Sequence, residues 1–141
     1  MLSAEDVIAL LYGKFMMLYN WMDFTIASDI YDKFKSKNPE WENIHWVKSN
    51  ISMYDKISGY LYNIEDRDII KYLQDIRHSR NNIVHTLIED PLEDDRSEIE
   101  LCDRMDSIIT ILQFEVERLE DLKKRKTSTG SWSFNQDYKF W

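Results

Sequence analysis

The stretch SAEDVIALLYGKFMMLYNWMD (residues 3–23) begins with a helix-start signal and continues with apolar residues at helical spacing. Ser3 and Asp6 resemble a capping box, in which side chains satisfy the free amide groups of a helix's first turn. The apolar residues that follow recur three or four positions apart and so share one face of a helix. They are Val7, Ile8, Leu10, Leu11, Phe15, Leu18, Tyr19 and Met22. The stretch predicts an amphipathic helix from about Ser3 to Asp23.

The same periodicity recurs along the chain, whereas strict alternation of apolar and polar residues is never sustained. Only three glycines and two prolines occur, so turn signals are sparse. The sequence SKNP (36–39) predicts a stop, because a residue before proline is pushed out of the helical region. The five predicted helices cover about residues 3–23, 26–34, 39–59, 69–87 and 99–126. We therefore predict an all-α protein, an antiparallel bundle of four to five helices.

Domain organisation follows from a change of composition near the C-terminus. Residues 1–126 form one predicted helical bundle domain, and residues 127–141 form a tail of small polar residues with five aromatic ones. The favoured interpretation of the tail is packing against its own bundle or a neighbour. The alternative is an aromatic platform on which nucleic-acid bases stack.

Charge and composition narrow the class of protein. The formal charge of −8 argues against a protein that coats nucleic acid, although a local phosphate site is compatible with it. The acidic segment 89–100 and the basic segment 123–126 are interpreted as solvated helix ends or loops. The first helix begins with acidic residues where a signal peptide is basic, and no window of about 18 residues lacks charge. We expect a cytoplasmic protein without a membrane segment.

Most catalytic signatures are absent, including the phosphate-binding glycine loops, the zinc motif H-E-x-x-H and the nucleophile elbow. No spacing of histidines, cysteine and carboxylates singles out a metal site, so neither a metal nor a cofactor is expected. Cys102 is interpreted as a small buried apolar residue of the last helix. His45 is interpreted as a half-buried histidine with a backbone partner.

The segment RHSRNNIVH (77–85) concentrates polar chemistry on the fourth predicted helix. Within it Arg80, Asn81 and His85 have the form R-N-x-x-x-H. This resembles the R-x(4 to 6)-H motif of the HEPN superfamily, small helical bundles that include ribonuclease toxins of toxin–antitoxin pairs and RNA-cleaving domains of antiviral systems. Requiring asparagine after the arginine leaves about 0.03 chance matches in a chain of this composition.

The resemblance implies a metal-independent endoribonuclease that serves as the toxin of a toxin–antitoxin or phage-defence system, with Arg80 and His85 as catalytic residues. The chemistry of the two side chains agrees with it. RNA carries its own nucleophile, the 2′-hydroxyl, and histidine is suited to accept its proton. Arginine is suited to stabilise the charge that builds on the phosphate oxygens, and the products would be a 2′,3′-cyclic phosphate and a 5′-hydroxyl.

Two neighbours of the motif are expected to support it. Asn81 lies four residues before His85 on one helix face and is placed to orient the imidazole or the RNA phosphate. Arg77 shares that face and is placed to extend the phosphate site, or else to pair with Asp75 or another surface neighbour.

The spacing of the motif raises a geometric difficulty. Five residues rotate about 140° beyond a full turn, so an unbroken helix aims Arg80 and His85 in different directions. Either the helix breaks near residues 81–82, or the apolar stripe that includes Arg80 faces another protomer. The second agrees with the family, whose subunits commonly pair their motifs across a two-fold cleft. We predict a homodimer with a site that combines both residues from both chains, one histidine acting as base and the other as acid.

The sequence is also compatible with other hypotheses. In one, Arg80 pairs with a carboxylate of the bundle while His85 faces solvent. In another, the whole chain is a non-catalytic acidic bundle that binds a basic protein, as an immunity or antitoxin subunit does, or a nucleotide-binding partner of a nucleotidyltransferase. In toxins paired with a minimal nucleotidyltransferase antitoxin the motif continues as H-x-Y, and the tyrosine receives nucleotides. Here Thr86 and Leu87 follow His85, which puts that regulation and that particular antitoxin in doubt.

Overall fold

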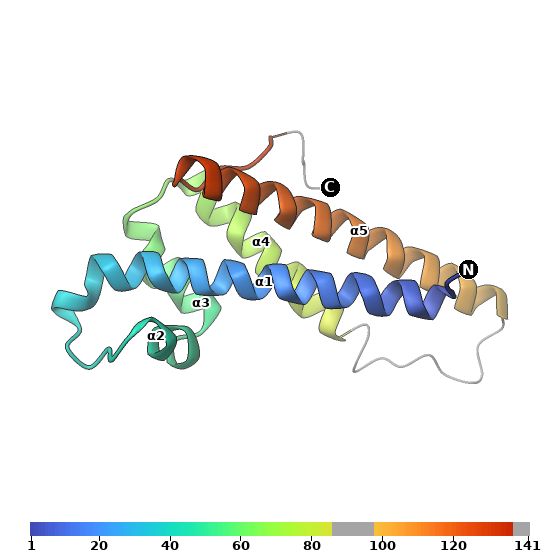
Figure 1. Ribbon diagram of the computed structural model, residues 1–141, viewed down its shortest axis with the longest axis horizontal. Helices are drawn as coiled ribbons and strands as arrows, with labels where there is room; N and C mark the ends of the chain where they lie inside the picture. The colour runs from blue at the N-terminus through green and yellow to red at the C-terminus, as the bar shows by residue number, and fades with distance from the viewer. Residues whose placement is uncertain (86–97, 137–141) are drawn as a thin grey trace.

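The computed structural model describes residues 1–85 and 98–136, and every regular element within them is helical. Three long helices dominate, and short helical segments join the first of them to the second (Figure 1). The prediction of an all-α bundle is confirmed. The α-helices are α1 (Ala4–Phe34), α2 (Ile44–Asn50), α3 (Met53–Asp55), α4 (Arg67–Val84) and α5 (Glu98–Thr129).

Helix α1 joins two helices that the sequence predicts separately, over 3–23 and 26–34. Its start is as predicted, since Ser3 Oγ accepts a hydrogen bond from the Asp6 amide at 3.1 Å. The predicted gap does not exist, because the Thr25 hydroxyl donates to the Trp21 carbonyl at 2.7 Å instead of capping a new helix. No glycine or proline interrupts the chain between residues 14 and 34, so the helix continues to Phe34. The stop at SKNP (36–39) is confirmed.

The prediction of one helix over residues 39–59 is wrong. Pro39 lies in a turn, and α2 begins later, where Asn43 Oδ1 accepts from the Trp46 amide at 2.8 Å. Ile51 is extended, and Ser52 then caps α3 through its hydroxyl. A π-helical turn over Lys56–Tyr60 and a 3₁₀ turn over residues 61–63 complete the segment. Two local caps therefore divide a stretch whose apolar spacing alone indicates one helix.

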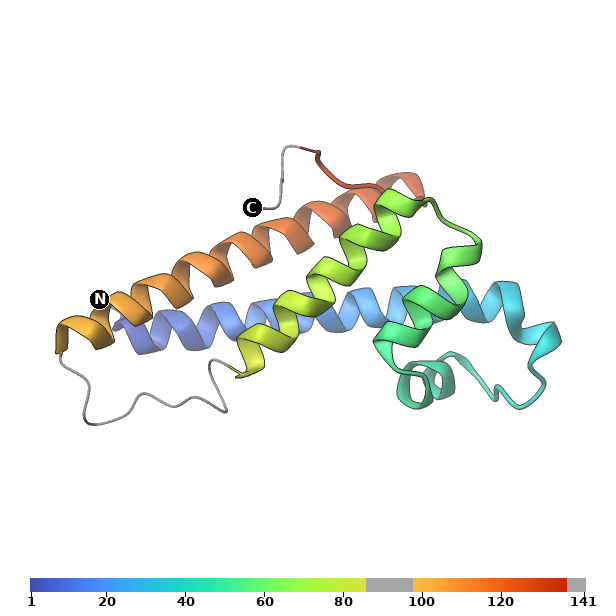
Figure 2. The ribbon, with the colours of Figure 1, turned by 180° about the vertical axis from the view of Figure 1, so that it is seen from behind.

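The three long helices pack side by side around one core. Helices α1 and α5 lie along each other and run in the same direction, while α4 runs opposite to both (Figures 1 and 2). The shared core is apolar and almost free of solvent. Its fully buried members from the three long helices are Phe15, Met22, Ile26, Ala27, Ile30, Leu73, Ile76, Leu112, Leu119 and Leu122.

Two ion pairs are buried with this core. Lys56 Nζ lies 2.6 Å from Asp23 Oδ1 and donates to the Lys48 carbonyl at 2.9 Å, so the short helices are tied to α1. On the other side Arg118 of α5 pairs with Glu115 one turn away and donates to Ser79 Oγ at 3.3 Å. The hydrogen bond to Ser79 joins α5 to α4 within the RHSRNNIVH segment. Burial raises the pKa of Glu115, and Arg118 opposes that rise.

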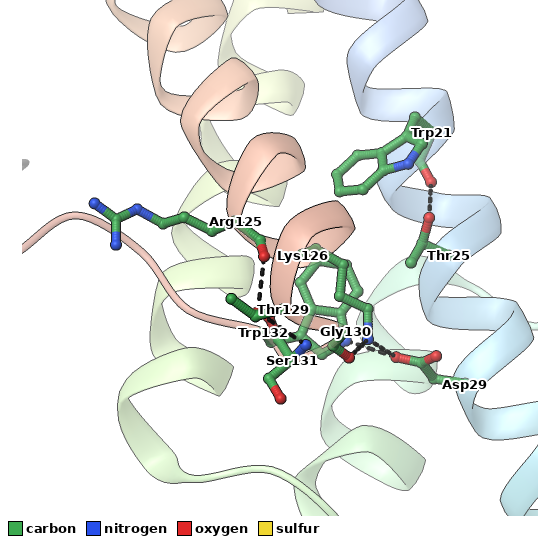
Figure 3. Close-up of polar contacts among 9 residues, drawn as sticks. All are labelled: Trp21, Thr25, Asp29, Arg125, Lys126, Thr129, Gly130, Ser131 and Trp132. Atoms are coloured by element: carbon green, nitrogen blue, oxygen red, sulfur yellow. Dashed lines mark hydrogen bonds and ion pairs between the residues drawn. The ribbon is translucent and has the colours of Figure 1, made fainter.

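The first part of the C-terminal tail packs against its own bundle, as expected. Helix α5 continues to Thr129, and Gly130 then takes a positive φ of 75°, which ends the helix. Trp132 is buried and its indole nitrogen donates to Asp29 Oδ2 at 2.7 Å (Figure 3). Lys126 binds the same carboxylate oxygen at 2.9 Å and lies over the Trp132 ring. Residues 137–141 lie outside the described residues.

Two predictions of burial are wrong. Cys102 is exposed, because the α5 stripe that contacts the core passes beside it. His45 is also exposed, and its ring packs beside Phe24 with centroids 5.5 Å apart. Most of the acidic segment 89–100 lies outside the described residues. No helix in the described part of the chain is both long and apolar enough to cross a membrane.

Candidate anion-binding site on helix α4

Arg80, in the last turns of α4, lies against a side chain of α1. Its guanidinium carbon is 5.7 Å from the centre of the Tyr19 ring, which α1 supplies. A guanidinium over an aromatic face is held by the ring quadrupole without losing its charge. The Nε atom of Arg80 is buried and has no hydrogen-bond partner among the described residues. The ring therefore positions a cation whose hydrogen-bonding capacity is only partly used.

Arg77 occupies the neighbouring position one turn earlier on the same face of α4. Its guanidinium carbon lies 5.2 Å from the centre of the Tyr54 ring on α3. Its Nε donates to Gln74 Oε1 at 2.6 Å, and Gln74 in turn reaches the Tyr54 carbonyl at 3.5 Å. Arg77 is thus oriented by neutral groups, as Arg80 is.

Neither arginine forms an ion pair with any carboxylate in the described ranges 1–85 and 98–136. The alternatives in which Arg80 pairs with a bundle carboxylate, or Arg77 with Asp75, are therefore not observed. In an acidic chain, two cations that no described carboxylate neutralises are placed to attract an external anion. This arrangement is the most specific chemical feature of the segment.

The phenol of Tyr19 responds to both arginines. Burial raises its pKa to about 12, the charge of Asp23 adds to the rise, and the charges of Arg80 and Arg77 oppose it. Arg80 lies over the Tyr19 ring and Arg77 lies one turn earlier on α4, so both charges act on the Tyr19 hydroxyl. The side chains Arg77, Arg80 and Tyr19 form one cluster, which we call the α4 arginine cluster.

The helix break near residues 81–82, the first of the two alternatives, does not occur. The His85 amide donates to the carbonyls of both Asn81 and Asn82, and His85 itself keeps a helical conformation. A continuous helix therefore separates the directions of Arg80 and His85 by about 140°. Arg80 lies half-buried against α1, whereas His85 is exposed at the end of α4. One protomer does not bring the two motif residues to one point.

The side chain of Asn81 contacts the neighbouring arginine of the motif. Its side-chain oxygen accepts a long hydrogen bond of 3.3 Å from the Arg80 guanidinium. The amide therefore contributes to holding the arginine. Arginine and asparagine of the motif act as a local unit, with the arginine between the Asn81 amide and the Tyr19 ring.

Sequence patterns do not reveal the tyrosines that contact the two arginines. Tyr19 has the spacing of an ordinary core residue, and Tyr54 is an exposed aromatic residue of a short helix. Their contacts with Arg80 and Arg77 depend on the packing of α1 and α3 against α4. A single sequence carries no local signal for such contacts.

The described residues contain no group of three or more His, Cys, Asp and Glu side chains placed to hold a metal ion.

No family model, curated protein or solved structure matches this chain. The chemistry assigned to the α4 arginine cluster therefore rests on its geometry alone. Two fixed cations at adjacent positions of one helix face suit a phosphate-bearing ligand, because each guanidinium can bind two phosphate oxygens.

Proposed function

We propose that this protein is a HEPN-like, metal-independent endoribonuclease. The observation that supports it most is the α4 arginine cluster, where Arg77 and Arg80 lack carboxylate partners within the described residues. The cluster belongs to the helix that carries the R-N-x-x-x-H sequence, and the exposed His85 lies on the next turn. An RNA phosphate bound by the arginines supplies the missing negative charge.

The proposed reaction uses the RNA's own nucleophile. The 2′-hydroxyl oxygen attacks the adjacent phosphorus while its proton passes to the His85 imidazole. The guanidinium of Arg80 stabilises the charge that develops on the phosphate oxygens, and Arg77 holds the neighbouring phosphate. The bond from phosphorus to the 5′ oxygen breaks, and that oxygen takes a proton from the second His85 of a dimer or from water. The products are a 2′,3′-cyclic phosphate and a 5′-hydroxyl end.

The divergence of Arg80 and His85 makes a second protomer part of this proposal. A two-fold axis near the end of α4 would set Arg80 of one protomer beside His85 of its partner and repeat the pair symmetrically. The biological role that goes with the activity is that of a cytoplasmic toxin or defence ribonuclease held in check by an antitoxin protein. The absence of tyrosine two residues after His85 argues for an antitoxin that acts by binding.

Cleavage of RNA by purified protein tests the proposal. Total RNA and a tRNA pool are incubated with the full chain in EDTA, beside the variants Arg80→Ala and His85→Ala. Cleavage that both substitutions abolish, and that leaves 2′,3′-cyclic phosphate ends, supports the proposal. His78→Ala and Arg67→Ala are matched controls, because each removes the same side-chain type from an exposed position of the same helix.

Two outcomes contradict the proposal. The first is an inactive wild type whose circular dichroism shows a folded helical protein, both with EDTA and with added Mg²⁺. The second is cleavage that survives both motif substitutions, which would indicate a contaminating nuclease or another site. An inactive folded protein would favour the binding module, whose acidic surface covers a basic protein partner.

A further inference from the structure

Helix α1 carries a line of exposed apolar side chains on the side that the bundle leaves uncovered. Leu10, Met17 and Phe24 are 62%, 76% and 39% exposed, respectively. They are seven residues apart, a spacing that drifts by only about 20° per heptad and so keeps all three in one row. The row is about 21 Å long at the helical rise. We call it the α1 ridge.

Two hollows flank the ridge, and Met17 lines both. The first, of about 680 Å³, lies between α1 and α5 and is lined by Lys14, Glu120, Lys123 and Lys124 among others. The second, of about 590 Å³, lies between α1 and α2. Its lining includes Trp21, Phe24, His45 and Lys48. The ridge with its two hollows is an apolar strip that has concave borders on both sides.

The charged side chains that line the two hollows are mainly positive, whereas the molecule as a whole is negative. Four lysines and a single carboxylate, Glu120, line the two hollows, whereas the chain has a formal charge of −8. Lys14 pairs with Glu120 at 3.2 Å, but Lys123 and Lys124 form no ion pair with any described residue. Lys48 lies 3.8 Å from Asp23, a longer contact than the one Asp23 makes with Lys56. The surface is therefore locally basic around an apolar centre.

We infer that the α1 ridge and its two hollows bind an acidic amphipathic helix of a partner protein. Apolar side chains of such a helix would pack against Leu10, Met17 and Phe24, and its flanking carboxylates would meet the lysines. About four turns of helix match the length of the ridge. The apolar centre distinguishes this ligand from nucleic acid, whose charged backbone gains little from three aliphatic and aromatic side chains in a row.

A second copy of this chain fits the surface less well. A two-fold contact would pair the ridge with itself and bring both sets of lysines together. Like charges facing each other across an interface oppose association. The charge of the borders thus favours an acidic partner over self-association.

The surface is separate from the α4 arginine cluster, and the inference does not rest on the proposed ribonuclease activity. Tyr19, which contacts Arg80, follows Met17 by two residues and therefore points about 200° away around α1. Loss of binding at the ridge leaves the cluster intact. Failure of one proposal consequently leaves the other open to its own test.

A synthetic peptide is the probe that tests this inference with the full chain. It has three heptads with leucine at positions a and d, glutamate at e and g, and alanine elsewhere. A control peptide has the same sequence with lysine in place of every glutamate. Fluorescence anisotropy of the labelled peptides is expected to show binding of the acidic peptide only, weakened by added salt.

Substitutions in the surface identify where the peptide binds. Met17→Glu and the pair Lys123→Glu with Lys124→Glu are each expected to weaken binding at least about tenfold. Tyr62→Glu and Lys37→Glu are controls, because they introduce glutamate at an exposed apolar residue and at an exposed lysine that belong neither to the ridge nor to the lining of its hollows. Circular dichroism shows whether each variant keeps the wild-type helix content.

Three results would overturn the inference. One is no binding of the acidic peptide, or equal binding of the basic one. Another is binding that Met17→Glu and the lysine pair leave unchanged while both variants stay folded. The third is self-association of the wild type in sedimentation, lost in Met17→Glu, because the ridge would then be an interface between copies. RNA cleavage is measured beside each variant and is expected to match the wild type.

Discussion

The guanidinium of Arg80 rests on the ring of Tyr19, so a motif residue of α4 is positioned by an aromatic side chain of α1. The contact lies inside the bundle and joins helices that are distant in the sequence. It holds the guanidinium in place, and no carboxylate of the described residues forms an ion pair with it. The packing of α1 on α4 is therefore also what orients the proposed phosphate-binding group.

The raised pKa of Tyr19 predicts a loss of stability in alkali. The phenol has a pKa of about 12 in the folded chain and its ordinary value of 10.0 in the unfolded chain, so the unfolded chain loses this proton first as the pH rises. Stability is complete below about pH 10 and falls between about pH 10 and 12, by up to about 3 kcal/mol. Urea unfolding at about pH 9 and about pH 11 measures the fall.

Two variants separate this effect from general alkaline denaturation. Tyr19→Phe keeps the aromatic ring under Arg80 but removes the ionisable hydroxyl. The stability of this variant should therefore change less over the same pH range. Arg80→Ala removes a charge that lowers the pKa of Tyr19, so the phenol should titrate at a higher pH than in the wild type. A pH dependence identical in the wild type and Tyr19→Phe would show that Tyr19 is not the group responsible.

The buried pair of Lys56 and Asp23 predicts unequal effects of its two substitutions. Asp23→Ala leaves a lysine that is 1% exposed without its carboxylate, and such a change costs about 3 to 5 kcal/mol. Lys56→Met replaces the lysine with an apolar side chain of similar length and leaves Asp23 beside Lys48, at a smaller cost. Chemical denaturation of both variants measures the difference, and equal losses would contradict the burial argument.

The effect of pH on stability that comes from Lys56 has the opposite sign to the effect that comes from Tyr19. Burial lowers the pKa of Lys56 below 10.5, and Asp23 opposes that shift. The unfolded chain then binds more protons than the folded chain just below pH 10.5, so this group adds stability as the pH rises through that window. Lys56→Met should remove that contribution, which is visible as a steeper alkaline loss in the variant than in the wild type.

The contact between the tail and the bundle predicts that Trp132 contributes to the stability of the fold. Trp132→Ala removes a buried ring that packs on Trp21 with centroids 5.9 Å apart, and the expected loss is about 3 to 5 kcal/mol. Trp132→Phe keeps most of the ring but loses the hydrogen bond to Asp29, so a smaller loss is expected. Urea unfolding of the variants checks the order, and an unchanged midpoint for Trp132→Ala would contradict it.

The parts of the fold that can be predicted from sequence are those with sustained apolar periodicity and few competing caps. The start of α1 at Ser3 and the body of α5 belong to this group. The prediction for the region after Pro39 is wrong, because Asn43 and Ser52 each start a short helix within one continuous apolar pattern. Local hydrogen bonds of this kind change the backbone without changing the spacing of apolar residues.

The candidate site is only partly predictable for a related reason. The sequence locates Arg77, Arg80, Asn81 and His85 on one helix, and the continuity of α4 then separates Arg80 from His85. The tyrosine partners of the arginines come from α1 and α3, so they depend on tertiary packing. The basic borders of the α1 ridge are equally hidden, since lysines from three helices meet there only after folding.

The most direct test of the central proposal is to mix two inactive variants. Arg80→Ala and His85→Ala proteins are each unable to cleave RNA if both residues act in catalysis. In a site shared between protomers, a mixed dimer holds one intact pair, with Arg80 from the His85→Ala chain and His85 from the other. After unfolding and refolding together, the mixture should recover up to about a quarter of wild-type cleavage. A mixture as inactive as either variant alone, although dimers form, would contradict the shared site.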